Sequence, residues 1–532
     1  MPHRRRDGRL TVVTADPGPD TVLFAREQWG AQIDFAVASK FDVSWAVQSA
    51  FHAALSERAI SVLSSRDPAM SARHVANLPQ VIVAYGLLTA CLLGLAIAPI
   101  GTLIALNVLM SLFYLGNFLL KGILVSLGGG RSAEADHAVA LAARELSDAQ
   151  LPVYTVLVPM YREHEMLPML AQALRDLDYP LGKLDIKLVL EADDHDTIAA
   201  ARALGLEGVF EVIRVPSSLP KTKPKACNYA LGFARGEYLV IYDAEDRPEL
   251  DQLRKVVATF ARSSENTACL QCRLNYYNAN DNWLTRMFTL DYSLWFDQVL
   301  PGLERLNIPI PLGGTSNHFK VGVLRELRAW DPFNVTEDAD LGIRLTQKGY
   351  RVGIVDSTTF EEASHQASAW IKQRSRWIKG YMQTLLVHTR RPLHLIKSTG
   401  LLGFLGFVFF IGGTALSGLL NPLFWALYLI WLVALWNGLD PMFPQILLFL
   451  SLLNLLAGNG AFIFLSMLAP IHRGWLHLIP YSLTVIGYWV LMSIAAYRAL
   501  WQLVRNPFYW GKTQHGRSRH ILGELRLARR RP

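Results

Sequence analysis

The sequence contains little cysteine. Its 532 residues include four cysteines, which are too few for a disulfide framework. Cys269 and Cys272 form a single C-x-x-C inside an apolar run that we predict to be a strand. Neither a second pair nor suitably spaced histidines accompany them, as a zinc site would require. A secreted disulfide scaffold is therefore excluded, and a zinc site is disfavoured.

Charged residues are also scarce, and the shortage is local. They make up 18% of the chain, against roughly 25% in an ordinary soluble domain. Four blocks contain no Asp, Glu, Lys or Arg, namely residues 75–120, 398–439, 441–471 and 474–497. A helix that crosses a ~30 Å hydrocarbon core needs about 20 residues, so the first two blocks fit two spans each and the last two fit one each. We expect six spans, at about 79–99, 101–124, 399–419, 422–437, 444–468 and 476–500. A soluble enzyme and a disordered chain are excluded.

The remaining charge sums to +8 and gathers at the two ends of the chain, at Arg4–Arg6 and at six arginines between Arg517 and Arg531. Basic flanks favour the cytoplasmic side of a membrane, and an even number of spans places both termini there. Nucleic-acid binding is a competing explanation of the pI near 9.2, but no basic motif with interleaved aromatics occurs away from the spans. We therefore expect no nucleic-acid partner. The first apolar run begins near residue 80, so we also expect no cleaved leader peptide.

The chain divides into five predicted parts. Residues 1–65 form a small α+β domain, in which 9–15 and 31–39 are expected strands and 20–29 and 42–60 expected helices. Residues 79–127 form a transmembrane hairpin, 398–502 a transmembrane domain of four helices and 503–532 a basic cytoplasmic tail. In residues 145–390, short β-branched runs at 153–158, 186–190, 209–215, 238–242 and 268–274 alternate with helical stretches. That alternation indicates a mostly parallel sheet covered on both faces, with ligands beyond the carboxyl ends of its strands.

An acidic turn, Asp243-Ala244-Glu245-Asp246, follows one of these strands. Such a cluster repels itself unless a cation neutralises it, and hard carboxylate ligands suit Mg²⁺ or Mn²⁺ shared with substrate phosphates. A solvated acidic turn is the alternative. Further along, Thr336-Glu337-Asp338 precedes a predicted helix, where Thr336 or Asp338 would also suit a helix cap.

A third motif, Gln373-Arg374-Ser375-Arg376-Trp377, places Gln373, Arg376 and Trp377 on one helical face. An arginine fork suits phosphate oxygens, and a tryptophan face stacks on the apolar side of a sugar ring. An amphipathic interfacial helix explains the same pattern.

In this order, and bracketed by membrane spans, the three motifs resemble those of family 2 membrane glycosyltransferases of the cellulose, chitin and hyaluronan synthase type. The motifs cover residues 150–390, and the topology extends the resemblance to about residue 515. It implies an α/β GT-A (Rossmann-like) cytoplasmic domain inserted in a six-helix α-helical transmembrane domain.

The implied activity is inverting, metal-dependent transfer from a UDP-sugar to a growing β-linked polysaccharide. The polymer would be exported through the spans across the bacterial inner membrane, where a periplasmic or outer-membrane partner would receive it. The alternatives are a non-processive enzyme with a lipid-linked acceptor and, from another class, a receptor or transporter whose transferase domain only binds. Intact carboxylates argue against a domain that only binds, and the lack of ionisable groups in the spans argues against transport alone.

The resemblance also assigns roles to individual residues. Asp338 matches the catalytic base, with Glu337 and Thr336 beside it, and a metal would lie at Asp243 with Glu245, where the family usually has Asp, or with Asp246. The residues implied for the nucleotide are Tyr161, Glu163, Glu191 or Asp193, Lys225, Asp243, Gln373 and Arg376. Those implied for the acceptor are Trp377, Ser316, Asn317 and His318. For His318 the alternative is a structural hydrogen bond. The segment with Trp510, Lys512, Thr513 and His515 is similar to a gating loop, although an interfacial aromatic anchor explains it as well.

The first residues, 8–17, resemble the second half of the N-terminal domain of type II secretion ATPases. In some relatives the first half of that domain binds cyclic di-GMP. That half is missing from this sequence, so the resemblance argues against cyclic di-GMP as a partner and favours a docking or vestigial role.

Overall fold

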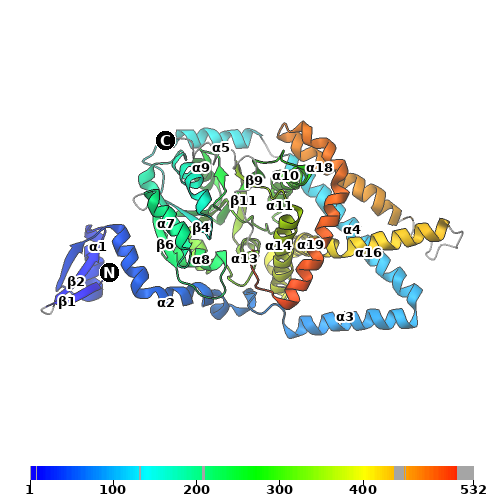
Figure 1. Cartoon of the computed structure of the whole chain (residues 1–532), viewed down its shortest axis with the longest axis horizontal. Coiled ribbons are helices and arrows are strands. Elements are labelled where there is room, and N and C mark those ends of the chain that lie inside the picture. Colours follow the sequence, from blue (N-terminus) through cyan, green and yellow to red (C-terminus); the bar gives the residue numbers. More distant parts are fainter. Residues whose placement is uncertain are drawn as a thin grey trace.

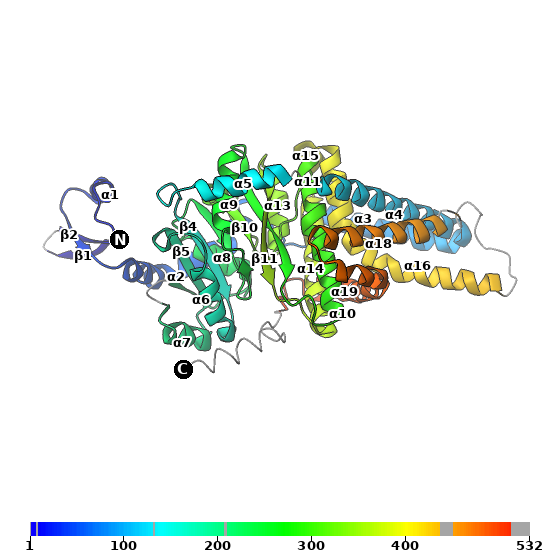
Figure 2. The same cartoon turned by 90° about the horizontal axis from the view of Figure 1, so that it is seen from above.

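The computed structural model describes residues 2–6, 9–130, 133–206, 210–436, 449 and 451–511. Three parts follow one another in space, a small N-terminal unit, an α/β body and a set of long helices (Figures 1 and 2). The chain enters the long helices, returns to build the body and then enters the long helices again, so the body lies in sequence between two groups of apolar helices.

The N-terminal unit contains the predicted order of strand, helix, strand and helix. These elements are β2 (Arg9–Thr14), α1 (Pro19–Trp29), β3 (Ile33–Val37) and α2 (Lys40–Arg66), and β1 (Pro2–Arg6) adds a strand that the sequence pattern did not indicate. Ser39 caps α2 by accepting a hydrogen bond from the Asp42 backbone N–H at 3.1 Å. The far end of α2 packs on the body, where Asn228 Nδ2 donates to the Ala59 carbonyl at 3.0 Å.

In the described part of the body, eight strands form one sheet in the order β6-β5-β4-β7-β10-β9-β11-β8. Four neighbouring pairs are parallel and three are antiparallel, so the sheet is more mixed than predicted. The strands are β4 (Tyr154–Met160), β5 (Leu184–Glu191), β6 (Glu211–Val215), β7 (Tyr238–Ile241), β8 (Arg247–Pro248), β9 (Thr267–Tyr276), β10 (Asn317–Lys320) and β11 (Arg351–Glu361). The five predicted strands are present as β4, β5, β6, β7 and β9.

Helices cover both faces of this sheet. Successive side chains of a strand point to opposite faces, so the apolar side chains of one strand contribute to two cores. Tyr154, Val156 and Val158 of β4 belong to one apolar core and Leu157 to the other. The helices of the body are α5 (Ala133–Glu145), α6 (Leu167–Arg175), α7 (His195–Ala203), α8 (Lys223–Leu231), α9 (Gln252–Arg262), α10 (Trp283–Leu294), α11 (Leu300–Arg305), α12 (Val321–Glu326), α13 (Glu337–Gln347) and α14 (Ala367–His388), with the short turns η1 (Pro68–Met70), η2 (His164–Met166), η3 (Leu181–Lys183) and η5 (Trp295–Val299).

Four helices in the described ranges are long and apolar enough to cross a membrane: Leu78–Ile97, Pro99–Gly129, Pro392–Ile430 and Leu476–Arg505. They comprise α3 (Leu78–Ile97), α4 (Pro99–Gly129), α15 (Pro392–Phe407), η6 (Val408–Gly412), α16 (Gly413–Trp436), η8 (Leu476–Thr484) and α19 (Val485–Arg505). A shorter apolar segment contains η7 (Asn454–Gly458) and α18 (Asn459–His472).

The six predicted spans need one correction. A break was expected at Asn421-Pro422, but α16 runs from Gly413 to Trp436 and continues through Pro422. Proline removes one backbone hydrogen bond, which apolar helices tolerate when neighbouring groups compensate. The backbone instead departs from helical geometry at Gly400, whose φ is 75°. Much of the predicted span at 444–468 lies outside the described residues, and α18 forms its later part.

The last long helix, α19, differs in direction from α3. In Figure 1, α19 stands upright beside α14, whereas α3 runs horizontally. Arg374 of α14 donates to the Tyr488 hydroxyl of α19 at 2.8 Å. The face of α19 turned away from the body exposes apolar side chains, among them Ile486, Trp501 and Val504. α19 therefore lies along the boundary between the body and the long helices.

The backbones of α4 and the η5–α11 segment are in direct contact through two glycines. A Cβ at Gly128 would lie 1.7 Å from the Gln298 carbonyl oxygen, and one at Gly302 would lie 2.2 Å from that of Leu124. Small residues permit this close approach of helices. The contact holds η5, and with it Trp295 and Phe296, at the boundary of the two parts.

We expect Gly128→Ala to destabilise the protein by about 1–3 kcal/mol or more, because the added methyl has no room and η5 must shift. The measurement is the thermal unfolding temperature of the purified protein in detergent. Gly122→Ala on the same helix is the matched control, since nothing lies within 4 Å of its added Cβ. Equal melting temperatures for the two variants would contradict the proposed tight contact.

Candidate active site

A cavity of about 750 Å³ joins the carboxyl ends of the central strands to the long helices. Tyr161 and Glu163 enter it just after β4, Glu191 ends β5, and Asp243 and Glu245 follow β7. Because β4, β5 and β7 are parallel neighbours, their carboxyl ends meet at one edge of the sheet. These candidates, which lie far apart in sequence, therefore share one cavity.

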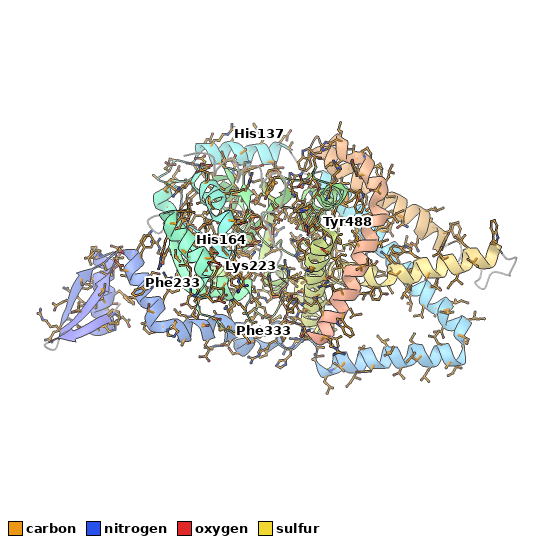
Figure 3. The ribbon with its side chains drawn as sticks, in the orientation of Figure 1. His137, His164, Lys223, Phe233, Phe333 and Tyr488 are labelled. Carbon is orange, nitrogen blue, oxygen red and sulfur yellow. The ribbon has the colours of Figure 1, made fainter. Side chains whose placement is uncertain are left out.

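Lys223, at the start of α8, lies among the carboxylates of this cavity and near the middle of the body in Figure 3. Its Nζ donates to Asp243 Oδ1 at 2.5 Å and to the Gly314 carbonyl at 2.6 Å. Burial alone lowers the pKa of the Lys223 ammonium, but the charges of Asp243, Asp338 and Glu337 raise it above its usual value. Lys223 therefore helps to balance the negative charge of these carboxylates.

The first turn of α13 carries Glu337 and Asp338, both buried at the cavity wall. Burial raises the pKa of Asp338 to about 6, Lys223 opposes the rise and Asp243 adds to it. Burial, with the charge of Asp338, raises the pKa of Glu337 as well. Asp338 Oδ1 has no hydrogen-bond partner among the described residues, which leaves this oxygen open to accept a proton from a substrate.

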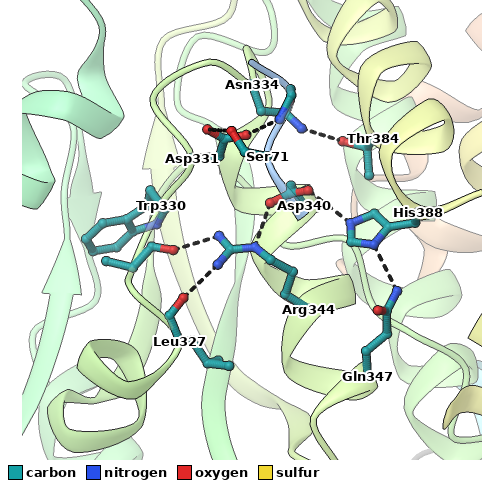
Figure 4. A network of polar contacts seen from close by, with 12 residues as sticks. Ser71, Leu327, Trp330, Asp331, Asn334, Asp340, Arg344, Gln347, Thr384 and His388 are labelled. Carbon is teal, nitrogen blue, oxygen red and sulfur yellow. Dashed lines mark hydrogen bonds and ion pairs between the residues drawn. The ribbon is translucent and has the colours of Figure 1, made fainter. Parts of the chain in front are cut away.

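A buried polar network fixes α13 behind these carboxylates (Figure 4). Asp340 accepts from Arg344 Nε at 2.8 Å and pairs with His388 Nε2 at 2.9 Å. Arg344 also donates to the carbonyls of Leu327 and Ala329 at 2.9 and 2.6 Å. Since His388 belongs to α14 and Leu327 and Ala329 precede α13, the network connects α13 to α14 and to the loop before α13.

The loop that leads into Thr336 is held from two further sides. Asp331 accepts from Ser71 Oγ at 3.1 Å and from the Ala72 backbone N–H at 2.5 Å, so the linker before α3 anchors it. Gln383 of α14 accepts from the Val335 backbone N–H at 3.1 Å. The fit is tight, because a Cβ at Gly380 would lie 2.3 Å from Thr336 Oγ1.

α14 supplies Gln373, Arg376 and Trp377 to the cavity lining. The guanidinium of Arg376 lies 4.7 Å from the Trp510 ring centroid, and the ring of Trp377 packs against those of Phe288 and Tyr292. Burial lowers the pKa of Arg376, although Glu337, Asp243 and Asp338 oppose that effect. An arginine and a tryptophan thus face the same space as Asp338 and Asp243.

Arg374, on the same helix, lies within 4.7 to 6.0 Å of the ring centroids of Phe288, Trp370, Trp377 and Tyr488. It also forms an ion pair with Asp291 of α10. The aromatic residues that shape the wall around Trp377 are therefore arranged about one cation.

A protein-family profile described as "Glycosyl transferase family group 2" matches residues 238–504, which is half of the chain. The chain belongs to this family. The matched range contains the acidic turn after β7, the first turn of α13 and the whole of α14.

Curated relatives of this family 2 glycosyltransferase match over 44% of its length. The β-monoglucosyldiacylglycerol synthase of Trichormus variabilis is 27% identical over 240 residues, and glucomannan 4-β-mannosyltransferase 1 of Oryza sativa is 26% identical over 246 residues. The matches cover 50% and 47% of these relatives, so the chain spans about half the length of the curated relatives it matches. A solved mannosyltransferase from Pyrobaculum calidifontis, in complex with GDP-Man and Mn²⁺, aligns with a TM-score of 0.43 at 20% identity, over 72% of this chain and 99% of that one.

Several residues that the resemblance assigned to this glycosyltransferase lie outside the cavity lining. Lys225 is fully buried and forms an ion pair with Glu191 at 3.0 Å. Asp193 forms an ion pair with Lys221 at 2.6 Å, and this pair is more exposed. Asp246 is buried, with its carboxylate accepting from the Asp243 backbone N–H and from Thr315. Of the two candidates for contact with the base, Glu191 therefore lines the cavity and Asp193 does not.

Ser316, Asn317 and His318, assigned to the acceptor, are buried in and beside β10 rather than in the cavity wall. His318 Nδ1 is 2.6 Å from the Tyr154 hydroxyl, and burial lowers the pKa of its imidazole to about 3. This contact and this burial agree with a structural hydrogen bond as the role of His318. Gly313 and Gly314 line the cavity in their place. Trp510 also lines it, whereas Lys512, Thr513 and His515 lie outside the described residues.

Among the described residues, no group of three or more His, Cys, Asp or Glu side chains is arranged to hold a metal ion. Asp243 and Glu245 nevertheless fit a shared site, because two carboxylates completed by substrate phosphates are a usual environment for Mg²⁺. Glu361 of β11 lines the same cavity, and burial together with Asp246, Glu245 and Asp243 raises its pKa. Lys223, Glu361 and Arg374 are among the cavity-lining residues that the sequence motifs did not single out.

Proposed function

We propose that this protein transfers a sugar from a UDP-sugar to a growing β-linked polysaccharide at the cytoplasmic face of the bacterial inner membrane, and leads the polymer into the membrane. One observation carries this proposal. A single cavity runs from Asp338, Asp243 and Arg376 to side chains of α4, α16 and α18. A site that served only a small soluble acceptor would have no need of that extension.

The membrane-side part of the cavity carries polar groups among its aromatic and aliphatic lining residues. Asn117 of α4, Asn421 of α16, and Asn454 and Ser466 on the segment of η7 and α18 all face it. Polar groups inside a membrane are costly and cluster where they serve a hydrated path or a ligand. Hydroxyl and amide groups beside Trp425 and Trp489 suit a sugar chain, which presents hydroxyls at its edges and apolar faces to aromatic rings.

In this proposal Asp338 takes the proton of the acceptor hydroxyl as that oxygen attacks the anomeric carbon from the side opposite the UDP. The single displacement inverts the anomeric configuration, so an α-linked donor gives a β-linkage. Arg376 and Lys223 stabilise the negative charge that develops on the departing diphosphate, and Trp377 supports the acceptor sugar. A Mg²⁺ or Mn²⁺ ion would be held by Asp243 and Glu245, and when bound it supplies further positive charge to the diphosphate.

A lipid-linked acceptor with a single transfer is the second candidate. The name of the Trichormus variabilis relative indicates a glycolipid product, which favours this candidate. The length of the cavity and the amide and hydroxyl groups along it favour the polymer. The two candidates differ in the size of their products.

Turnover of the purified full chain in lipid nanodiscs tests the proposal. Each of a set of radiolabelled UDP-sugars is supplied with Mg²⁺ or Mn²⁺, and the products are separated by size. We expect one donor to give a product of high molecular weight, and EDTA to stop its formation until excess Mn²⁺ is restored. A product confined to short glycolipid would contradict processive synthesis, and turnover that persists in EDTA would contradict the role of the metal.

The pH dependence of transfer should report Asp338. Its pKa of about 6 is raised by burial, and only the ionised carboxylate accepts a proton. The initial rate at saturating donor should therefore be level above about pH 7 and fall about tenfold per unit below pH 6. A rate that stays constant down to pH 5 would contradict Asp338 as the base.

A further inference from the structure

Lys121 is the only charged residue among the 31 residues of α4. It lines the cavity, eight residues before the end of the helix at Gly129. At 1.5 Å per residue, its Cα lies about 12 Å along the helix from that end. The ammonium is therefore placed on the membrane side of the reacting groups, along the path that the acceptor would take.

Lys121 has no hydrogen-bond or ion-pair partner within the part of the chain that the structure describes. Its Nζ lies 4.9 Å from the ring centroid of Phe462 on α18. Asp291 is the carboxylate whose negative charge acts on the Lys121 ammonium. That carboxylate already forms an ion pair with Arg374 and accepts from the Tyr488 hydroxyl at 3.2 Å. Two cations thus share one anion at this level of the cavity.

Keeping an ammonium without its own counterion away from bulk water costs free energy. Binding of a negatively charged group beside it would therefore be favourable. The polar residues that line the cavity further into the membrane part are not basic. Ser111, Asn117 and Asn454, which line the cavity on the membrane side, offer hydroxyl and amide groups, and Phe462 offers a ring face.

From this arrangement we propose that the membrane-side cavity binds an acidic glycan, with Lys121 paired to a carboxylate on one of its sugars. The inference rests on the proposed function for the path of the chain and adds the chemical class of the glycan. A uronic-acid carboxylate brings the missing negative charge, and the other hydroxyls of the glycan meet the asparagine and serine groups. The amides and hydroxyls of Ser111, Asn117 and Asn454 favour this occupant over a lipid carrier, because a glycan can hydrogen-bond to them and a hydrocarbon tail cannot.

Binding without a donor sugar tests the proposal. The full chain in nanodiscs is titrated with a β-linked hexamer of glucuronic acid and, separately, with a β-linked hexamer of glucose. The wild type should bind the acidic hexamer about tenfold more tightly at low salt. Lys121→Met should lower the affinity for the acidic hexamer to that for the neutral one and leave the neutral affinity unchanged. Lys121→Arg should retain the preference, and Lys397→Met, outside the cavity lining, should behave as wild type.

Three results would overturn the assignment. Equal affinity of the wild type for both hexamers would remove the acidic preference. An equal loss of affinity for both hexamers in Lys121→Met would mean that the ammonium donates hydrogen bonds to sugar hydroxyls and does not pair with a carboxylate. Binding of a short prenyl phosphate that depends on Lys121, without binding of the acidic hexamer, assigns the cavity to a lipid carrier. UDP binding to each variant reports whether the nucleotide site is intact. Because no transfer occurs in this assay, its outcome is distinguishable from failure of the proposed function.

Discussion

Asp338→Asn is expected to lower the rate of sugar transfer by about 10³-fold while leaving UDP affinity within about twofold of wild type. General base catalysis contributes typically 10²–10⁴-fold, and asparagine keeps the shape of the side chain but takes no proton. Asp338 lies 3.9 Å from the position of a Cβ at Gly314 and faces the cavity at the first turn of α13. The measurement pairs single-turnover transfer with equilibrium binding of UDP.

The same variant should be at least as stable as wild type at pH 7.5. Burial raises the pKa of Asp338 to about 6, so the folded state holds an ionised carboxylate at a cost that the unfolded chain does not pay. The neutral amide removes that cost. A melting temperature that is unchanged or higher, together with lost turnover, would assign the loss to chemistry. Loss of UDP binding would instead place Asp338 among the nucleotide contacts.

The sequence predicted the parts of the site that follow from periodicity and strand ends. Apolar runs of β-branched residues marked β4, β5 and β7, and polar residues after them, such as Tyr161 and Asp243, meet in the cavity because parallel strands end at one edge. The heptad-like spacing of Gln373, Arg376 and Trp377 likewise predicted one face of α14. These features depend on local geometry, which the sequence carries directly.

Contacts between distant segments could not be predicted in the same way. The resemblance assigned Ser316–His318 to the acceptor, but β10 inserts antiparallel between β7 and β9, and these residues are buried. Lys223 and Lys225 are two residues apart at the start of α8, and the motif pointed to Lys225. The helix turns them to different sides, so Lys225 meets Glu191 and Lys223 meets Asp243.

Prediction of the membrane helices from the sequence is limited in a similar way. Charge-free blocks predicted how much chain is apolar enough to cross a bilayer, but not where one helix ends. Pro422 looked like a boundary, yet α16 continues through it because helix continuity depends on the surrounding contacts as well as on the proline. Tyr114 donates to Asn421 Oδ1 beside this proline, which is one such contact.

Lys223→Met is expected to lower the transfer rate by about 10²-fold and to weaken UDP binding about tenfold. The Lys223 ammonium lies among Asp243, Glu337 and Asp338, and its removal leaves Arg376 as the main cation that would face the diphosphate of the proposed donor beside these carboxylates. Loss of both affinity and rate separates this variant from Asp338→Asn, which should affect rate alone. The measurements are UDP titration and single-turnover transfer at fixed metal concentration.

Lys255→Met is a matched control, because the side chains of Lys223 and Lys255 are both 16% exposed and both pair with carboxylates, but Lys255 lies outside the cavity lining. Lys223→Arg should recover part of the affinity, since it restores the charge with a longer and wider head group. If Lys223→Met bound UDP and turned over like Lys255→Met, the contact with Asp243 would be an ordinary ion pair. The expected difference between the two lysines follows from their surroundings. Lys255 pairs with Glu249 and Asp251, whose side chains are 39% and 41% exposed, and an ion pair contributes little there. Lys223 is enclosed by the carboxylates that would lie beside the diphosphate of the proposed donor.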